Sequence, residues 1–252
     1  MAKVISITNQ KGGVGKSTTA QALASGLAII KGYKVLLVDL DAQGNATYAT
    51  GAQELEATAY EVMTDKEIIT NAIYDAGKID ILPSSPNLSK LDIELDQTGK
   101  EYKLKEAINK VKKYYDFIII DTPPALGILT VNALTTSDYA IIPAQADIYS
   151  LQGVGQLLET ITGIKKYTNK GLQLCGILLT RYNARTILSK DMRAMIENTA
   201  EQVGTFLYNT VIREGIAIKE AQASRQDIFT YDLNSHAAND YLDFIGELLE
   251  RV

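Results

Sequence analysis

The hydrophobic positions of the chain fall into short unbroken runs, separated by longer segments with helical spacing. The runs are rich in β-branched residues and cover 4–8, 35–38, 79–82, 117–120, 139–142 and 174–179. Continuous runs of this kind are typical of strands buried on both faces of a parallel sheet. Apolar residues recur at helical intervals over 18–30, 102–112, 151–165, 190–203 and 237–249. The pattern therefore predicts strands and helices in alternation.

This alternation runs from end to end, and no low-complexity stretch, internal repeat or linker divides the sequence. It predicts a single α/β domain over residues 1–252, with a mostly parallel twisted sheet and helices on both faces. Ligands of such sheets bind beyond the carboxyl ends of the strands. Loops that follow strands are therefore where chemistry is expected.

Composition narrows the class of protein. The 252 residues are 46% hydrophobic and 22% charged, as in soluble globular proteins. The one cysteine, Cys175, excludes a disulfide framework within one chain and is expected to be a small core residue. Neither a signal peptide nor an apolar run of membrane-spanning length is seen, so we expect a cytoplasmic protein that does not span a membrane.

The charge distribution bears on nucleic-acid binding. A net charge of −5 excludes a simple polycation that coats DNA. Residues 181–225 contain seven basic and five acidic side chains and carry +2, which leaves −7 for the rest of the chain. This asymmetry is mild, but it permits a local basic patch.

A glycine-rich loop, NQKGGVGKST at 9–18, follows the first predicted strand and precedes a helix. Its glycines allow backbone N–H groups to turn toward phosphates, and the helix N-terminus adds positive potential. In this pattern Lys16 reaches the β- and γ-phosphates and Ser17 supplies a hydroxyl to Mg²⁺. Gln10 occupies the first glycine position of the generic motif, and Lys11 is a second lysine with no obvious role on the chain's own phosphates.

Carboxylates follow two other predicted strands. Asp121 ends the run 117–120, where an acidic residue can hold Mg²⁺ through water. Asp39 and Asp41 leave the run 35–38, so one can stay near the metal while the other orients or polarises the attacking water. The only histidine, His236, is expected at a surface or helix start, which leaves no Ser-His-Asp triad.

Together the three loops resemble the ParA/Soj/MinD group of deviant Walker ATPases. The similarity to ParA/Soj-type partition proteins covers nearly the whole chain. It is carried by NQKGGVGKSTT (9–19), VLLVDLDAQGNAT (35–47), DFIIIDTPPALGILTVNAL (116–134), LQGVGQLL (151–158), ILLTRYNARTILS (177–189) and EAQASRQDIFTYD (220–232).

The resemblance implies an ATPase of low intrinsic turnover that requires ATP and Mg²⁺. An ATP-bound sandwich homodimer is expected to bind non-specific DNA and so to associate with the nucleoid. A ParB-type centromere-binding partner is expected to stimulate hydrolysis and release the dimer. Chromosomal, plasmid and mobile-element cargoes all remain open.

The resemblance also assigns residues. Lys11 crosses to the ATP of the partner subunit, Asp41 positions water, and Arg185 contacts DNA. Arg213 and Gly215 replace a proline and an asparagine that help to shape the family's adenine pocket, and Ala217 replaces a DNA-contacting arginine, whose role Arg213 or Lys219 takes over. The predicted catalytic residues are Lys11, Lys16 and Asp41. The predicted nucleotide-binding residues are Lys11, Gly12, Gly13, Val14, Gly15, Lys16, Ser17, Thr18 and Arg213. The predicted metal ligands are Ser17 and Asp121, and the predicted DNA contacts are Arg185, Arg213 and Lys219.

Other members of the superfamily fit less well. A MinD-like membrane regulator ends in a basic amphipathic helix, whereas residues 241–252 are acidic. An iron–sulfur reductase of the nitrogenase type needs two cysteines per chain, and a tyrosine autokinase needs a clustered tyrosine tail. No helix-turn-helix is expected before the glycine-rich loop, which begins by residue 9. A protein-positioning ATPase that does not act through DNA, and a small-molecule ligase, stay open.

Overall fold

The computed structural model describes residues 1–52 and 55–252. Within them the centre is an eight-stranded sheet of order β3-β4-β2-β5-β1-β6-β7-β8, in which only the β3–β4 pair is antiparallel. The strands are β1 (Lys3–Ile7), β2 (Val35–Asp39), β3 (Tyr74–Asp75), β4 (Asp80–Leu82), β5 (Phe117–Asp121), β6 (Tyr139–Ala144), β7 (Gln173–Tyr182) and β8 (Leu207–Arg213). The single mostly parallel α/β sheet predicted from the sequence is confirmed.

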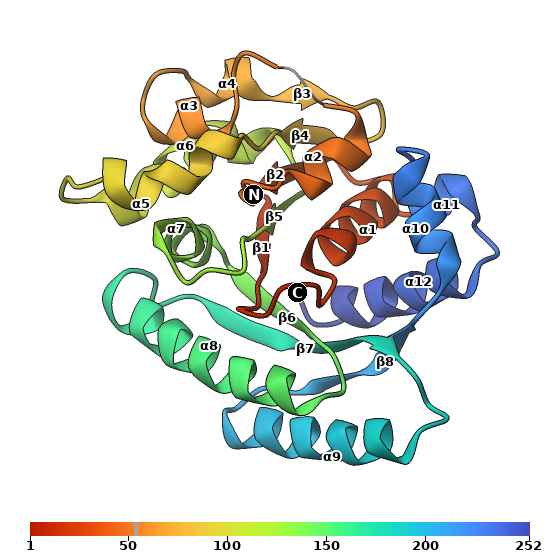
Figure 1. Cartoon of the computed structure of the whole chain (residues 1–252). Helices are drawn as coiled ribbons and strands as arrows, with labels where there is room; N and C mark the ends of the chain where they lie inside the picture. The colour runs from red at the N-terminus through yellow and green to blue at the C-terminus, as the bar shows by residue number, and fades with distance from the viewer. Residues whose placement is uncertain (53–54) are drawn as a thin grey trace.

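Helices cover both faces of this sheet (Figure 1). One face packs against α1 (Lys16–Ile29), α10 (Ile216–Ala223), α11 (Ile228–Tyr231) and α12 (His236–Leu249). The other face packs against α3 (Ala59–Met63), α4 (Ile69–Ala72), α5 (Leu91–Glu94), α6 (Lys103–Val111), α7 (Ile128–Thr136), α8 (Ile148–Tyr167) and α9 (Ile187–Gln202). The short α2 (Asn45–Thr50) follows β2, and three 3₁₀ turns lie at Pro86–Lys90, Lys100–Tyr102 and Lys112–Tyr114.

The strand order places a topological switch at β1. The chain leaves β1 toward β2 on one side, whereas β5 is followed by β6 on the other side of β1. Parallel strands end at the same edge of a sheet, so the loops after β1, β2 and β5 open together, at the place where α/β proteins bind ligands. This common edge was predicted from the sequence and is confirmed.

The regular elements were predicted best where they are buried on both faces. All six hydrophobic runs are strands, and all five helical segments are helices to within three residues at each end. The edge strands β3 and β8 were not predicted, because β3 has only two residues and β8 mixes buried with exposed positions. Cys175 is buried in β7, and exposed His236 opens α12 behind a Ser235 cap, both as expected. In the described residues no helix is long and apolar enough to cross a membrane.

Candidate functional site

The glycine-rich loop wraps the space in front of α1, and neighbouring strand ends hold it there. Gly13 and Gly15 have φ values of +75° and +84°, which residues with a Cβ rarely adopt. The Val14 carbonyl accepts a hydrogen bond from the Thr180 hydroxyl at 2.8 Å, and the Gly13 carbonyl accepts one from the Gln145 amide at 3.2 Å. These two hydrogen bonds hold the loop backbone, whose glycine-rich form suits phosphate binding. The side chain of Val14 itself is fully buried, so its contribution to the loop is its backbone.

Lys16 opens α1 at the bottom of this loop. Its side chain is only 6% exposed, and its ammonium group donates to the Lys11 carbonyl at 3.2 Å. Burial lowers the pKa of Lys16, while the nearby carboxylates of Asp121 and Asp41 act in the opposite direction. A largely desolvated cation of this kind binds phosphate oxygens more strongly than a surface lysine does.

Asp121 ends β5 and is fully buried. Both of its carboxylate oxygens lack a hydrogen-bond partner in the described structure. Burial, followed by the neighbouring charge of Asp39, raises the pKa of Asp121 well above its usual value. An unpartnered buried carboxylate is costly, so its presence calls for a bound partner. Asp121 lies beside Ser17 in the first turn of α1. A carboxylate and a hydroxyl group together suit an oxygen-liganded cation such as Mg²⁺.

The structure separates the roles of Asp39, which ends β2, and Asp41, which follows it. Asp39 is fully buried, and its oxygens accept the Asp41 N–H at 3.1 Å and both the N–H and the hydroxyl of Thr47 at 2.8 Å. Burial is the main reason that the pKa of Asp39 rises to about 6. Asp41 instead lines the cavity, with one carboxylate oxygen accepting only the Gln43 N–H at 3.0 Å. Asp39 therefore builds the loop, and Asp41 is the carboxylate that faces the site.

Lys11 points away from the cavity, toward the start of α8. Its ammonium group lies 2.5 Å from Asp147 Oδ2 and 3.4 Å from both Gln145 Oε1 and Ser150 Oγ. Asp147 also caps α8, because its Oδ1 accepts the Ser150 N–H at 2.8 Å. Burial acts to raise the pKa of Asp147, but the hydrogen bonds from Lys11 and Ser150 hold that pKa below its usual value. Sequence reasoning did not find Asp147, although it follows a predicted strand as the other site carboxylates do.

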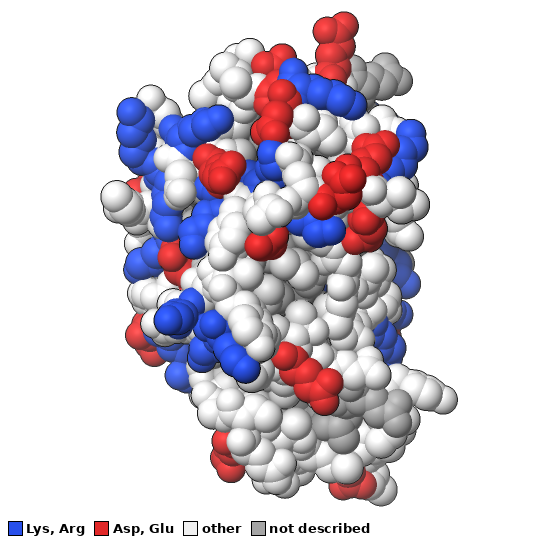
Figure 2. Space-filling view, turned by 90° about the vertical axis from the view of Figure 1, so that its left-hand side faces the viewer, with Lys and Arg blue, Asp and Glu red and all other residues white. Residues whose placement is uncertain are grey.

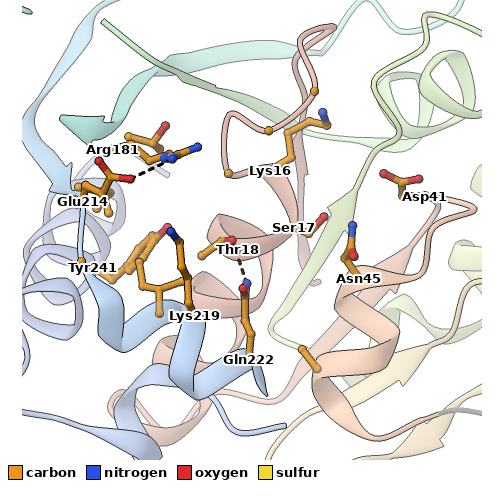
Figure 3. A pocket seen from close by; sticks show the side chains of 18 of the residues that line it. Lys16, Ser17, Thr18, Asp41, Asn45, Arg181, Glu214, Lys219, Gln222 and Tyr241 are labelled. Carbon is orange, nitrogen blue, oxygen red and sulfur yellow. Dashed lines mark hydrogen bonds and ion pairs between the residues drawn. The ribbon is translucent and has the colours of Figure 1, made fainter. Parts of the chain in front are cut away.

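A cavity of about 640 Å³ runs from the glycine-rich loop to the ends of β7 and β8. Figure 3 shows Lys16 and Ser17 between Asp41 on one side and the Arg181–Glu214 pair on the other. We call Arg181, Arg213, Glu214 and Lys219 the β7–β8 rim. The first three lie at or just beyond the ends of these strands, Lys219 follows in α10, and all four line the cavity. The cavity extends beyond the glycine-rich loop as far as this rim. Arg181 and Glu214 were not singled out from the sequence.

The rim is held by ion pairs. Arg181 Nη2 lies 2.9 Å from Glu214 Oε1, and both side chains are about half exposed. Arg213 makes a two-pronged contact with the buried Asp240 of α12, with Nη2 2.6 Å from Oδ1 and Nε 3.0 Å from Oδ2. The Asp240 carboxylate also accepts the Arg213 N–H at 2.9 Å. The Arg213 guanidinium is thus held by α12 at the cavity wall.

Most of the predicted site residues come together here. Those that line the cavity are Gly12, Gly13, Gly15, Lys16, Ser17, Thr18, Asp41, Arg213 and Lys219. Asp121 lies at the same sheet edge, paired in register with Asp39. Arg185 is exposed in the loop between β7 and α9 and does not line the cavity. The DNA roles predicted for Arg185, Arg213 and Lys219 therefore stay predictions.

Comparisons with known proteins agree with this geometry. A family model described as an AAA domain matches residues 2–174. The sporulation initiation inhibitor protein Soj of Bacillus subtilis is 42% identical over 253 residues, covering 98% of each chain. The chromosome partitioning protein ParA of Myxococcus xanthus is 34% identical, over 99% of this chain and 88% of that protein.

Solved structures give the same picture. A plasmid partition protein from Borrelia burgdorferi bound to AMPPNP has a TM-score of 0.86 and 26% identity, and the match covers all of both chains. A cobyrinic acid a,c-diamide synthase from Mycobacterium smegmatis, with bound ADP and magnesium, has a TM-score of 0.81 and 33% identity, over 99% and 95% of the chains. Both similar structures therefore hold an adenine nucleotide or an analogue of one.

Proposed function

Because the chain belongs to the ParA/Soj family of P-loop ATPases, we propose that it is a DNA-partition ATPase whose ATP-bound dimer holds non-specific DNA and releases it on hydrolysis. The observation that carries the proposal is the convergence of Lys16, Asp41 and the unpartnered Asp121 on one sheet edge. Lys11 lies in the same glycine-rich loop, but its ammonium group is paired with Asp147 instead of facing the cavity. The family relationship to Soj and ParA supports the partition role.

In this proposal the inner end of the cavity binds ATP and Mg²⁺. The backbone N–H groups of residues 12–18 and the ammonium of Lys16 hold the phosphates. Ser17 and Asp121 hold Mg²⁺, which neutralises charge on the phosphates when it is bound. Asp41 orients the attacking water. Slow turnover is expected, because the described cavity offers no strong base beyond this carboxylate.

Lys11 couples two subunits in the proposal. In the single chain its ammonium group is paired with Asp147 instead of facing the cavity. Reaching the ATP of a partner subunit requires that pair to open. The γ-phosphate supplies the stronger anion that favours the open arrangement, and its loss on hydrolysis restores the pair. ATP then shifts the population between monomer and dimer.

DNA binding is proposed for the loop between β7 and α9. Arg185 is exposed there, and Lys190 and Arg193 follow on α9. The face shown in Figure 2 carries Lys and Arg interspersed with Asp and Glu, so that face offers no continuous basic surface. Pairing two copies of a small patch in a dimer increases the number of phosphate contacts and therefore the affinity.

Co-sedimentation with non-specific duplex DNA tests the proposal, with ATP, ADP or no nucleotide across a salt series. We expect binding in the presence of ATP but not with ADP or without nucleotide. The slope of log K against log salt should be near −0.9 per phosphate contacted. Arg185→Ala should make that slope shallower by about one contact per subunit. Hydrolysis without DNA binding in any nucleotide state would favour the alternative, a protein-positioning ATPase that does not act through DNA.

Two variants test the parts of the cycle separately. Asp41→Ala should keep ATP-dependent dimers and hold them on DNA, because only the hydrolytic step is removed. Lys11→Ala should keep some ATP affinity but lose the dimer. ATP-dependent dimers of Lys11→Ala in sedimentation would contradict the role given to Lys11, and rapid dissociation of Asp41→Ala from DNA would contradict the role given to Asp41.

A further inference from the structure

Asp41 is held in place by a closed ring of hydrogen bonds that reaches outside the nucleotide cavity. Asp39 accepts the Asp41 N–H at one carboxylate oxygen and the Thr47 hydroxyl at the other. The Thr47 hydroxyl oxygen in turn accepts the Ser84 N–H at 2.8 Å. The Ser84 hydroxyl then donates to the Asp41 carbonyl, which closes the ring.

Ser84 connects this ring to a different strand, β4. It lies just beyond β4, next to Pro83, whose carbonyl accepts the Ala59 N–H at 2.8 Å. β4 pairs with β2 in parallel register, so both strands deliver their following loops to the same edge. Ser84 is partly buried and does not line the cavity. Its contact with Asp41 is therefore indirect support for the site and not a contact with nucleotide.

The Asp41 N–H is held by Asp39, whereas the Asp41 carbonyl depends on Ser84 for a hydrogen bond from outside its own loop. The Asp41 carbonyl has one other partner, the Gly44 N–H at 2.8 Å, which belongs to the same loop. Gly44 has a φ of +62°, and a Cβ placed there would lie 3.9 Å from Ser84 Cβ, so Ser84 also packs against this turn. The bond from Ser84 is the one that ties the Asp41 carbonyl to another strand.

We propose that Ser84 is a positioning residue for hydrolysis, which sets the main chain of Asp41 so that its carboxylate holds the attacking water in line. The inference rests on the proposed role of Asp41. Ser84 influences the hydrolytic step and not ATP binding, because the glycine-rich loop and Lys16 bind the phosphates independently of this ring. A small displacement of a catalytic group lowers the rate strongly without removing any substrate contact.

The test is steady-state hydrolysis together with ATP affinity for Ser84→Ala, Ser84→Thr and Ser85→Ala. Ser84→Ala should lower kcat by about tenfold, with KM and the Kd for ATP within about twofold of the parent. Ser84→Thr keeps the hydroxyl and should recover most of the rate. Ser85→Ala is the matched control, because the Ser85 hydroxyl accepts only the Asn87 N–H in the next turn, and parental kcat is expected.

Thermal unfolding separates positioning from general destabilisation. Ser84→Ala and Ser85→Ala should lower Tm by similar small amounts, although only the first slows hydrolysis. If kcat falls equally in both variants, or if Ser84→Ala loses ATP affinity in proportion to kcat, Ser84 has no positioning role. A parental kcat in Ser84→Ala would equally exclude that role.

The hydrolysis rate of Asp41→Ala distinguishes a failure of the Ser84 proposal from a failure of the role proposed for Asp41. Loss of hydrolysis in Asp41→Ala with a parental rate in Ser84→Ala overturns the assignment of Ser84 alone. A parental rate in Asp41→Ala overturns the proposed role of Asp41, and the inference about Ser84 with it. If both proposed roles are correct, adding Ser84→Ala to Asp41→Ala should not lower the hydrolysis rate further, because the two residues then act through the same water.

Discussion

The two ends of the cavity are built in different ways. At the inner end, Lys16, Asp41 and Asp121 are 6%, 7% and 0% exposed. Lys16 opens α1 after the central strand β1, Asp41 follows β2 and Asp121 ends β5. At the β7–β8 rim, Arg181 and Glu214 are 50% and 55% exposed and lie at or beyond the end of the sheet's outer strands. Charges in the buried site interact strongly, whereas exposed pairs are screened by water and salt.

This difference predicts unequal tolerance to substitution. A charge removed from the inner end is not readily replaced, because the groups around it are buried and shielded from water. The rim carries two cations in ion pairs and a third, Lys219, so the loss of one changes the local field only modestly.

Lys16→Ala should give the largest loss. Removing the buried cation takes away the main charge on the phosphates, so hydrolysis should fall by about 100-fold or more. Initial rates and the affinity for a fluorescent ATP analogue are the measurements. Lys31→Ala, at an exposed position after α1, is the control and should keep the parental rate. A loss of less than about tenfold would mean that the inner end is as tolerant as the rim.

Asp121→Asn should stabilise the metal-free protein in a pH-dependent manner. Because the folded-state pKa of Asp121 is raised above 3.8, the folded state binds more protons than the unfolded state once the pH exceeds that value. The parent therefore loses stability as the pH rises from about 4 toward 7, and the variant, which cannot ionise there, loses less. The variant should be more stable at pH 7 by about 2 kcal/mol.

Urea unfolding at pH 5, 6 and 7 measures that difference, first in EDTA and then with Mg²⁺ and ADP. Mg²⁺ with ADP should stabilise the parent more than the variant, because Asn supplies no charge to the metal. A difference that is the same at all three pH values would show that Asp121 does not titrate with the raised pKa described above. Equal stabilisation by Mg²⁺ and ADP would remove Asp121 from the metal site.

Asp147→Asn should strengthen ATP-dependent dimers by about two- to fivefold per subunit, or about five- to thirtyfold for a dimer in which both pairs open. Asn can still cap α8, but it no longer holds the Lys11 ammonium as an ion pair, and a partly exposed pair of this kind contributes about 0.5–1 kcal/mol. Sedimentation of the variant with ATP gives the dimer affinity. Asp65→Asn is the matched control, since it removes a different ion pair, with Lys103, at a φ of +57° that Asn tolerates. Unchanged or weaker dimers would show that the Asp147 pair does not oppose dimerisation.

The same contrast explains what the sequence could predict. The position of the inner end followed from the sequence, because its strands are continuous β-branched runs that end at one sheet edge and the glycine-rich loop follows the first of them. The roles of its residues stay predictions. The residue pattern alone left Asp39 and Asp41 open, and only the resemblance assigned the attacking water to Asp41. The hydrogen bonds from Thr47 show that the Asp39 carboxylate is already occupied.

Of the rim, the sequence pointed to Arg213 and Lys219 but missed Arg181 and Glu214, for a physical reason. β8 is an edge strand with exposed positions, so its hydrophobic pattern is weak, and Arg181 and Glu214 are 33 residues apart in sequence. The contacts of Arg213 with Asp240 and of Lys11 with Asp147 join elements that no local pattern relates. Side-chain pairing across the fold is the part of the site that periodicity and motifs do not encode.

The smallest effect is expected at the rim itself. Arg181→Met and Glu214→Gln should each leave the Kd for ATP within about twofold of the parent, because an exposed ion pair contributes little and the phosphates carry most of the binding. The Kd values of both single variants and of the double variant for ATP and GTP measure this. A change of tenfold or more, for ATP but not GTP, would instead mean that the pair contacts the base and that the rim contributes to nucleotide selectivity despite its exposure.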